Sequence, residues 1–352
     1  MTDLIEHWHR WMSAMSVQVC VLVAIVLLID RLIRRWCWPQ LRAALWYLPM
    51  VKLVITPALS SPVSLARLAS ADSTANGGVS MVNQAVLYGL FAIWLTGAVA
   101  SSLWMFRRYR YLNRMIKRPS VAHPAWLGDV IDDAADRLRL TRRPQIVVWD
   151  DQVGPSVYGC IRPVVILPAG LMTPSNRETL EHVLLHELAH IKRFDTMLSV
   201  ACQLLQIVYW FHPLVWLTRR QLTTLREVCC DDAVVRALKG RSSEYRRTLL
   251  NFARTVLAPS TPSLGLITPH GQLIARLEAL ANPVRSSLPL RYGVTVLMFG
   301  LLSAVALPLA PPRRDGTQPG TLPKYPGCLQ LRYTVIGMMA DMDRQDLLAD
   351  GS

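Results

Sequence analysis

The stretch that decides the fold is "LLHELAHIKRFD", Leu184–Asp195, which contains the pattern His-Glu-x-x-His. His186 and His190 are four positions apart, so on an α-helix they share a face and lie about 6 Å apart along the axis. Two imidazoles at that separation can bind one metal ion, and Glu187 is placed to reach a water on that metal. The pattern therefore predicts a zinc peptidase helix. Zn²⁺ would lower the pKa of the water to about 7, and Glu187 would take its proton.

The residues before the motif predict where this helix begins. Ser175 and Glu178 match an S-x-x-E capping box, and Thr173-Pro174 also suits a first helical turn. We expect one continuous helix from there to Phe194. Its apolar positions recur at helical spacing, at Leu180, Val183, Leu184, Leu188 and Ile191.

A third metal ligand is expected on a second helix, "LTTLREVCCDDAVVRAL" at residues 222–238. Glu227 lies among the apolar positions of that helix, where a solvated glutamate is not expected, so we predict that it binds the metal. Asp231 is four residues further on the same face, and we predict that it accepts a hydrogen bond from the free ring N–H of His186. The alternatives are a surface ion pair for Glu227 and a solvated charge for Asp231.

Composition indicates a membrane protein. Hydrophobic residues make up 52% of the 352 residues and charged residues only 18%, a balance that is unusual for a soluble domain. Long apolar runs predict four transmembrane helices, at about 11–29, 43–59, 82–106 and 291–310. Lys52 interrupts the second run, so we expect it to face other helices or to snorkel. The seven cysteines form no CxxC pair and predict neither a disulfide framework nor a cysteine zinc site.

The basic residues predict the orientation in the membrane. They account for much of the net charge of +14 and cluster at 31–42 and 107–118. Positive-inside bias places both clusters in the cytoplasm, with both termini on the outer side of the membrane. The expected organisation is three helices in 1–110, a cytoplasmic peptidase domain at 111–290, a fourth helix at 291–310 and an extracytoplasmic tail at 311–352. Because the charges lie at membrane edges, no direct nucleic-acid partner is expected.

A fifth apolar run, Thr196–Thr218, conflicts with the zinc site if it crosses the membrane, because Glu227 would then emerge on the side opposite His190. His212-Pro213 resolves the conflict, since proline breaks a helix and lets the chain reverse. We therefore predict a hairpin with helices at about 195–211 and 213–238 that packs against or dips into the bilayer. Trp210 and Trp216 suit an interfacial depth.

Two further histidines and the segment before the zinc helix are assigned structural roles. His212 is interpreted as a polar turn residue and His182 as structural. The segment "PQIVVWDDQVGPSVYGCIRPVVILPAGL" is rich in Val and Ile, and predicts short strands at 145–149, 156–160 and 164–167.

Four segments in order, "GPSVYGCIRPVVILP", "HELAHIKRFD", "WFHPLVW" and "REVCCDDAVV", resemble the BlaR/MecR-type membrane metallopeptidases, the sensor-transducers of inducible beta-lactam resistance. The resemblance implies a multi-pass α-helical membrane protein with an inserted α+β gluzincin-like zinc metallopeptidase domain. It implies Zn²⁺ ligands at His186, His190 and Glu227, with Glu187 as the catalytic residue. The implied activity is site-specific cleavage of a cytoplasmic transcriptional repressor or of the protein itself.

The chain departs from that family in one respect. The namesake receptors carry a penicillin-binding sensor with an S-x-x-K nucleophile, and no such motif follows residue 310, so we do not expect direct beta-lactam sensing. Two alternative functions stay open at this point: a membrane quality-control metalloprotease, and a non-proteolytic transducer in which zinc is structural. The stimulus, the substrate and a homodimeric state are also open.

Overall fold

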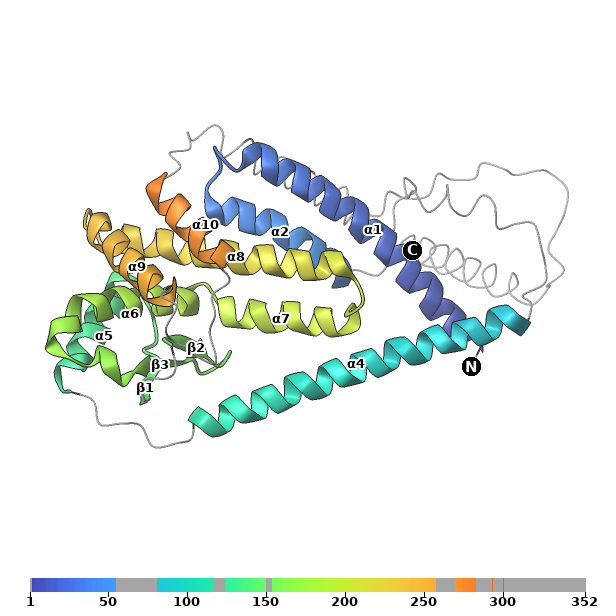
Figure 1. Cartoon of the computed structure of the whole chain (residues 1–352), viewed down its shortest axis with the longest axis horizontal. Coiled ribbons are helices and arrows are strands. Elements are labelled where there is room, and N and C mark those ends of the chain that lie inside the picture. Colours follow the sequence, from blue (N-terminus) through green and yellow to red (C-terminus); the bar gives the residue numbers. More distant parts are fainter. Residues whose placement is uncertain are drawn as a thin grey trace, which may run out of the picture. The chain divides into compact units, whose positions relative to one another are not determined.

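The computed structural model describes residues 2–54, 81–116, 124–149, 154–257 and 270–282, together with the single residues 293 and 300. These residues belong to one compact unit, Met1–Leu309. The first part of the chain forms α1 (Thr2–Ile33), α2 (Pro39–Val54) and α4 (Met81–Ile116), as Figure 1 shows. The predicted fourth transmembrane helix at 291–310, apart from two single residues, and the tail at 311–352 lie outside the described residues.

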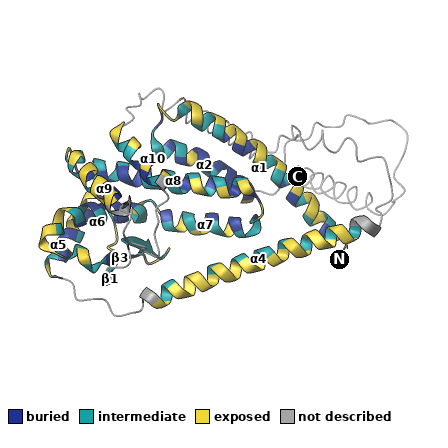
Figure 2. Cartoon of the chain, viewed as in Figure 1, coloured by how far each residue is buried: buried dark blue, intermediate teal, exposed yellow. Residues whose placement is uncertain are grey.

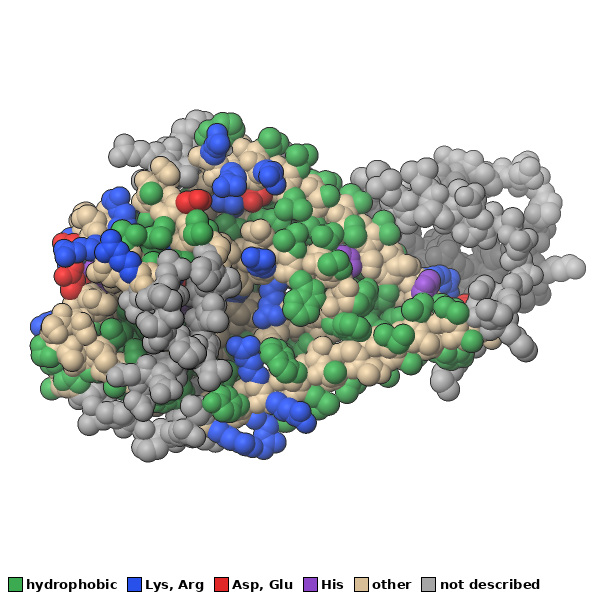
Figure 3. Space-filling model, in the orientation of Figure 1, with side chains coloured by type: hydrophobic (Ala, Val, Ile, Leu, Met, Phe, Trp, Pro, Cys, Tyr) green, Lys and Arg blue, Asp and Glu red, His purple; other side chains and the backbone are tan. Residues whose placement is uncertain are grey.

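Within the described residues, two helices have the length and apolar composition to cross a membrane, Asp3–Ile33 and Gln84–Arg114. The most apolar part of the second has no buried residue, and its surface is apolar, as expected of a helix in contact with lipid (Figure 2). Lys and Arg side chains gather near the carboxyl-terminal end of α4 (Figure 3). Their positions coincide with the first and third predicted spans, of which the first is extended at both ends and the third at its carboxyl-terminal end.

The helix α2 corresponds to the second predicted span, of which residues 55–59 lie outside the described residues. Its 16 residues pack against α1 and α8, and Lys52 is buried among these helices, which agrees with one of its two predicted environments. The chain reverses between α1 and α2, where Arg42 Nε lies 2.6 Å from Asp30 Oδ1.

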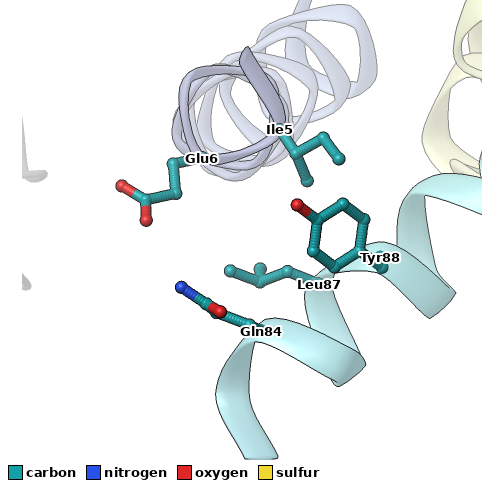
Figure 4. Close-up of a pocket in the computed structure, with 5 residues that line it drawn as sticks. All are labelled: Ile5, Glu6, Gln84, Leu87 and Tyr88. Atoms are coloured by element: carbon teal, nitrogen blue, oxygen red, sulfur yellow. The ribbon is translucent and has the colours of Figure 1, made fainter. Parts of the chain in front are cut away.

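The helices α1 and α4 run in the same direction where they touch. The ring of Trp8 meets that of Phe91 edge-to-face at 5.2 Å and that of Trp94 at a tilt at 5.3 Å. Residues that precede these three on each helix line a small crevice (Figure 4). A parallel α1–α4 pair is what two spans with the same predicted orientation require. The crevice is lined by Ile5, Glu6, Gln84, Leu87 and Tyr88.

A three-stranded sheet follows α5 (Trp126–Arg137). It consists of β1 (Gln145–Trp149), β2 (Ser156–Tyr158) and β3 (Val164–Pro168) in the order β1-β3-β2. The strand β1 is parallel to β3, and β2 is antiparallel to it. All three predicted strands are present. The second is shorter than predicted because Gly159 turns the chain with a φ of +94°.

The zinc-motif helix is α6 (Arg177–Lys192), which follows two 3₁₀ turns, Ala169–Leu171 and Pro174–Asn176. The predicted capping box is wrong. Pro174 starts a separate tight turn, so Ser175 lies inside that turn and Asn176 takes the capping position. Ser175 Oγ instead lies 3.2 Å from Thr173 Oγ1, and no side chain among the described residues caps α6.

The fifth apolar run is a helical hairpin, as predicted. α7 (Asp195–Val208) and α8 (Pro213–Ala237) are joined by a reversal at residues 209–212. The turn packs against α4, because Trp94 Nε1 donates to Val208 O at 2.8 Å and Trp210 Nε1 donates to Trp94 O at 3.1 Å. A Cβ on Gly97 would overlap the Trp210 ring. The chain then continues into α9 (Ser242–Leu257) and α10 (His270–Ala281).

The helix α8 belongs to two hydrophobic cores. Its first half packs with α1, α2 and α7, through Leu222 and Leu225 among others. Its last turns pack with α5, α6 and the sheet, through Val234 and its C-cap residue Leu238. Glu227 and Asp231 lie between these two groups on α8. The helix therefore carries the predicted site residues at the junction of the two cores.

Candidate metal centre

The structure brings the three predicted ligand side chains together. α6 and α8 pack against each other. His186 Nε2 lies 3.3 Å from Glu227 Oε2, and His190 Nε2 lies 3.7 Å from Glu227 Oε1. One donor atom from each of the three residues lies within 4.8 Å of the other two. Two imidazole nitrogens and one carboxylate oxygen form a donor set that suits Zn²⁺.

Each imidazole is held from behind by a carboxylate. His186 Nδ1 lies 3.1 Å from Asp231 Oδ1, and His190 Nδ1 lies 2.9 Å from Asp195 Oδ2. When the proton of a neutral imidazole is on Nδ1, that N–H donates a hydrogen bond to the carboxylate, and the lone pair of Nε2 is free to bind a metal. Both Nε2 atoms face Glu227. Asp231 occupies its predicted place, whereas the sequence analysis missed the role of Asp195, although it ends the quoted motif.

Asp231 sits at the centre of a buried polar network. It is 1% exposed and accepts a hydrogen bond from Tyr245 Oη at 2.5 Å and two from Arg276 at 2.8 Å each. Burial alone would raise the pKa of Asp231, but Arg276 and His186 hold it well below its usual value. Tyr245 and Arg276 were not predicted. The sequence signal that could have indicated burial of Arg276 is its place on the apolar face of its helix, three residues after the buried Leu273.

Electrostatics in the cluster favour a cation. Burial and Arg276 oppose protonation of His186, but hydrogen bonds to Asp231 and Glu227 raise its pKa to about 9. Burial opposes ionisation of Glu227, yet the two histidines and Arg276 lower its pKa to about 2. The carboxylates thus create a negative potential around the imidazoles, which a divalent cation would relieve. The described residues therefore fit a metal ion.

Glu187 lies on α6 directly after His186 and is 8% exposed. Burial raises the pKa of Glu187 above that of a free glutamate, although the two neighbouring histidines act in the opposite direction. A raised pKa suits a carboxylate that must take up and return a proton.

Glu227 does form an ion pair, but with a buried arginine and not at the surface, as the alternative would require. Two arginines that precede it on α8 have other partners: Arg219 donates to Gln206, and Arg226 donates to Ser199. The cation beside Glu227 is Arg276, whose Nη1 lies 3.3 Å from Oε2.

The two remaining histidines of this region lie outside the trio, as predicted. His182 is fully buried, with Nδ1 2.8 Å from Thr248 Oγ1. His212 begins α8 at the hairpin turn and faces α1, where its Nε2 lies 3.4 Å from Ser16 O and 3.8 Å from Cys20 Sγ.

Comparison with known proteins shows the family to which the chain belongs. The family model described as "BlaR1 peptidase M56" matches residues 11–280, which include α6, α8 and all but the last residue of α10. The chain belongs to the BlaR1 peptidase M56 family. Regulatory protein BlaR1 of Bacillus licheniformis is 32% identical over 181 residues, 49% of this chain and 29% of that protein. Methicillin resistance mecR1 protein of Staphylococcus aureus is 21% identical over 154 residues, 44% of this chain and 26% of that protein. The aligned parts thus span less than a third of either relative.

Proposed function

We propose that the protein is a zinc endopeptidase of the bacterial inner membrane that acts in signal transduction, and that it cleaves a cytoplasmic repressor-like protein, itself, or both. The observation that carries the proposal is the meeting of His186, His190 and Glu227 across α6 and α8. Glu187 is buried next to His186 and close enough to all three for their charges to act on it. Family membership supports peptidase activity. The relatives are named as a regulatory protein and a resistance protein, which favours signalling over quality control.

The protein side chains have separate tasks in the proposed reaction. His186, His190 and Glu227 would hold the metal, and Asp231 and Asp195 would keep the imidazoles in the required tautomer and orientation. Zinc, when bound, supplies Lewis acidity that lowers the pKa of water to about 7 and polarises a carbonyl. Glu187 takes the proton from the attacking water and then gives it to the leaving amine. Hydrolysis therefore needs no covalent intermediate with the protein.

The proposed location follows from charge and helix direction. The helices α1 and α4 cross the membrane in the same direction, and the basic end of α4 lies in the cytoplasm. The hairpin enters the apolar layer from the cytoplasmic side without crossing it, so α6 and the end of α8 remain on one side. A protein substrate in the cytoplasm can then reach Glu187.

The test is the Glu187→Gln variant of the full chain. It removes the proton acceptor and leaves the three metal donors intact, so we expect wild-type metal content and loss of cleavage. This inactive variant is then used to capture substrates from the cell, which are identified by mass spectrometry. Glu178→Gln, at an exposed position on the same helix, is the matched control and should cleave normally. Wild-type proteolysis by Glu187→Gln would refute the proposal.

A further inference from the structure

We propose that Arg276 is a positioning residue that holds Glu227 and Asp231 together, so that tight metal binding requires α10 to be docked against α8. This inference rests on the proposed zinc site and extends it to a helix that carries none of the metal donors. The position of α10 would control the site through the contacts of Arg276 with these two carboxylates.

The contacts of Arg276 join two acidic residues of α8, Glu227 and Asp231. Its Nε and Nη2 donate to Oδ2 and Oδ1 of Asp231, both at 2.8 Å, and its Nη1 lies 3.3 Å from Oε2 of Glu227. One guanidinium thus contacts a proposed metal donor and the carboxylate that orients His186. The planar fork of arginine matches this bidentate geometry, which the single ammonium of lysine cannot reproduce.

Charge and burial make this contact important. Glu227 and Asp231 are one helical turn apart on α8, so their carboxylates repel each other. Asp231 is 1% exposed and Arg276 is 8% exposed, so water cannot replace the guanidinium without opening the site. A buried carboxylate that loses its cationic partner is costly and either reorients or takes up a proton. In both cases His186 would lose the acceptor that fixes its ring.

The helix α10 is attached mainly by one face. Leu273 packs against Leu249 and Ala253 of α9, and Leu280 packs at the edge of the sheet-side core. Arg276 is the polar residue within this inward face. The predicted fourth transmembrane helix begins at residue 291, shortly after α10 ends at Ala281. A displacement that separates α10 from α8 would therefore remove Arg276 from both carboxylates.

The first experiment measures the Zn²⁺ affinity of the full chain in detergent by competition with a chromogenic chelator. We expect Arg276→Gln to bind Zn²⁺ about 10- to 100-fold more weakly than wild type, the range typical for residues that orient metal ligands. Arg276→Lys should be intermediate, because it keeps the charge but loses the fork. The control for charge is Arg246→Gln, at an exposed position of α9 where the arginine donates to Ser242 of its own helix.

The opposite result is clearly distinguishable. If Arg276 acted only as a repulsive charge near the metal, its removal would strengthen Zn²⁺ binding, and Arg276→Lys would match wild type. Wild-type or tighter affinity in folded Arg276→Gln would overturn the inference. A wild-type chain that binds Zn²⁺ but cleaves nothing would refute the proposed function instead and leave the role of Arg276 intact.

A second measurement uses the wild-type protein and does not depend on the folding of a variant. Coupling between two sites is reciprocal, so if α10 must dock for tight metal binding, metal binding must stabilise the docked helix. We expect Zn²⁺ to slow amide hydrogen exchange in 270–281, while exchange in α5 changes little. Equal exchange in α10 with and without Zn²⁺ would contradict the inference.

Discussion

Asp195 Oδ2 lies 2.9 Å from Nδ1 of His190, although the two residues belong to different helices. The chain turns sharply between α6 and α7, with Phe194 in the left-handed conformation at a φ of 56°. This turn brings Asp195 back toward the His-Glu-x-x-His motif, which precedes it in the sequence. Arg193 Nε and Cys230 Sγ also contact the same oxygen, at 3.2 Å and 3.4 Å. His190 is therefore oriented by the first residue of the hairpin.

Replacement of Asp195 should weaken metal binding. Asp195→Ala leaves His190 Nδ1 without its acceptor, and we expect a 10- to 100-fold loss of Zn²⁺ affinity in chelator competition. Asp195→Asn should lose less, because its amide oxygen can still accept the hydrogen bond. Asp133→Ala, at an exposed position of α5, serves as the control. Equal affinities for Asp195→Ala and wild type would show that His190 needs no such support.

Gly97 should be sensitive to a single added methyl group. Gly97→Ala places a Cβ into the Trp210 ring, so we expect the hairpin to separate from α4 and stability to fall by about 1–3 kcal/mol. Gly89→Ala is the matched control on the same helix, because no atom lies within 4 Å of its Cβ position. It should be neutral or stabilising by about 0.5–1 kcal/mol. Thermal unfolding in detergent measures both, and equal stability of the two variants would contradict the predicted overlap.

Cysteine labelling should place both ends of the hairpin on one side of the membrane. Single cysteines at Lys192 and Arg236, both exposed, are introduced into a chain whose native accessible thiols are replaced by serine. We expect a membrane-impermeant maleimide to label both in inverted vesicles and neither in intact spheroplasts. His9→Cys, near the start of α1, should show the reverse. Opposite accessibility of the first two positions would exclude a shared metal site.

Stability should fall in mild acid partly because of His182. Burial lowers the pKa of His182 below that of a free histidine, so the folded protein keeps the ring neutral. As pH falls below about 6.5 the unfolded chain takes up a proton that the folded chain does not, and unfolding becomes easier. His182→Gln should therefore flatten the dependence of Tm on pH between about 7.5 and 5.5. His9→Gln, at an exposed position, should leave the wild-type slope unchanged.

The elements that could be predicted from the sequence are those with local signals. Three signals of this kind were sufficient: the helical period of α6, the helix break at Pro213 and the valine-rich strands. In each case the residues that carry the signal lie in or next to the element that they specify. The inward-facing position of Glu227 could also be predicted, because a charged residue among the apolar positions of a helix is itself a local anomaly. The capping box failed for a local reason as well, since Pro174 diverts the chain into a separate turn.

The remaining part of the site depends on contacts between distant segments. Tyr245 follows Asp231 by 14 residues along the chain and Arg276 follows it by 45, each on a different helix. No periodic pattern in the sequence indicates which buried tyrosine or arginine contacts Asp231. Asp195 was close in sequence, but its role depends on a left-handed residue at Phe194, a conformation that is unusual for a bulky side chain. Such positions require the tertiary packing of α8, α9 and α10.

The continuous helix α8 has a practical consequence for protein engineering. Because one face of it is covered by α1 and α2, a water-soluble peptidase fragment that begins after α4 would present Leu222 and Leu225 to solvent. Such a fragment would tend to aggregate before its chemistry could be assayed. The amino-terminal helices and the proposed metal centre therefore share one core helix, and chimaeras between relatives should exchange them together.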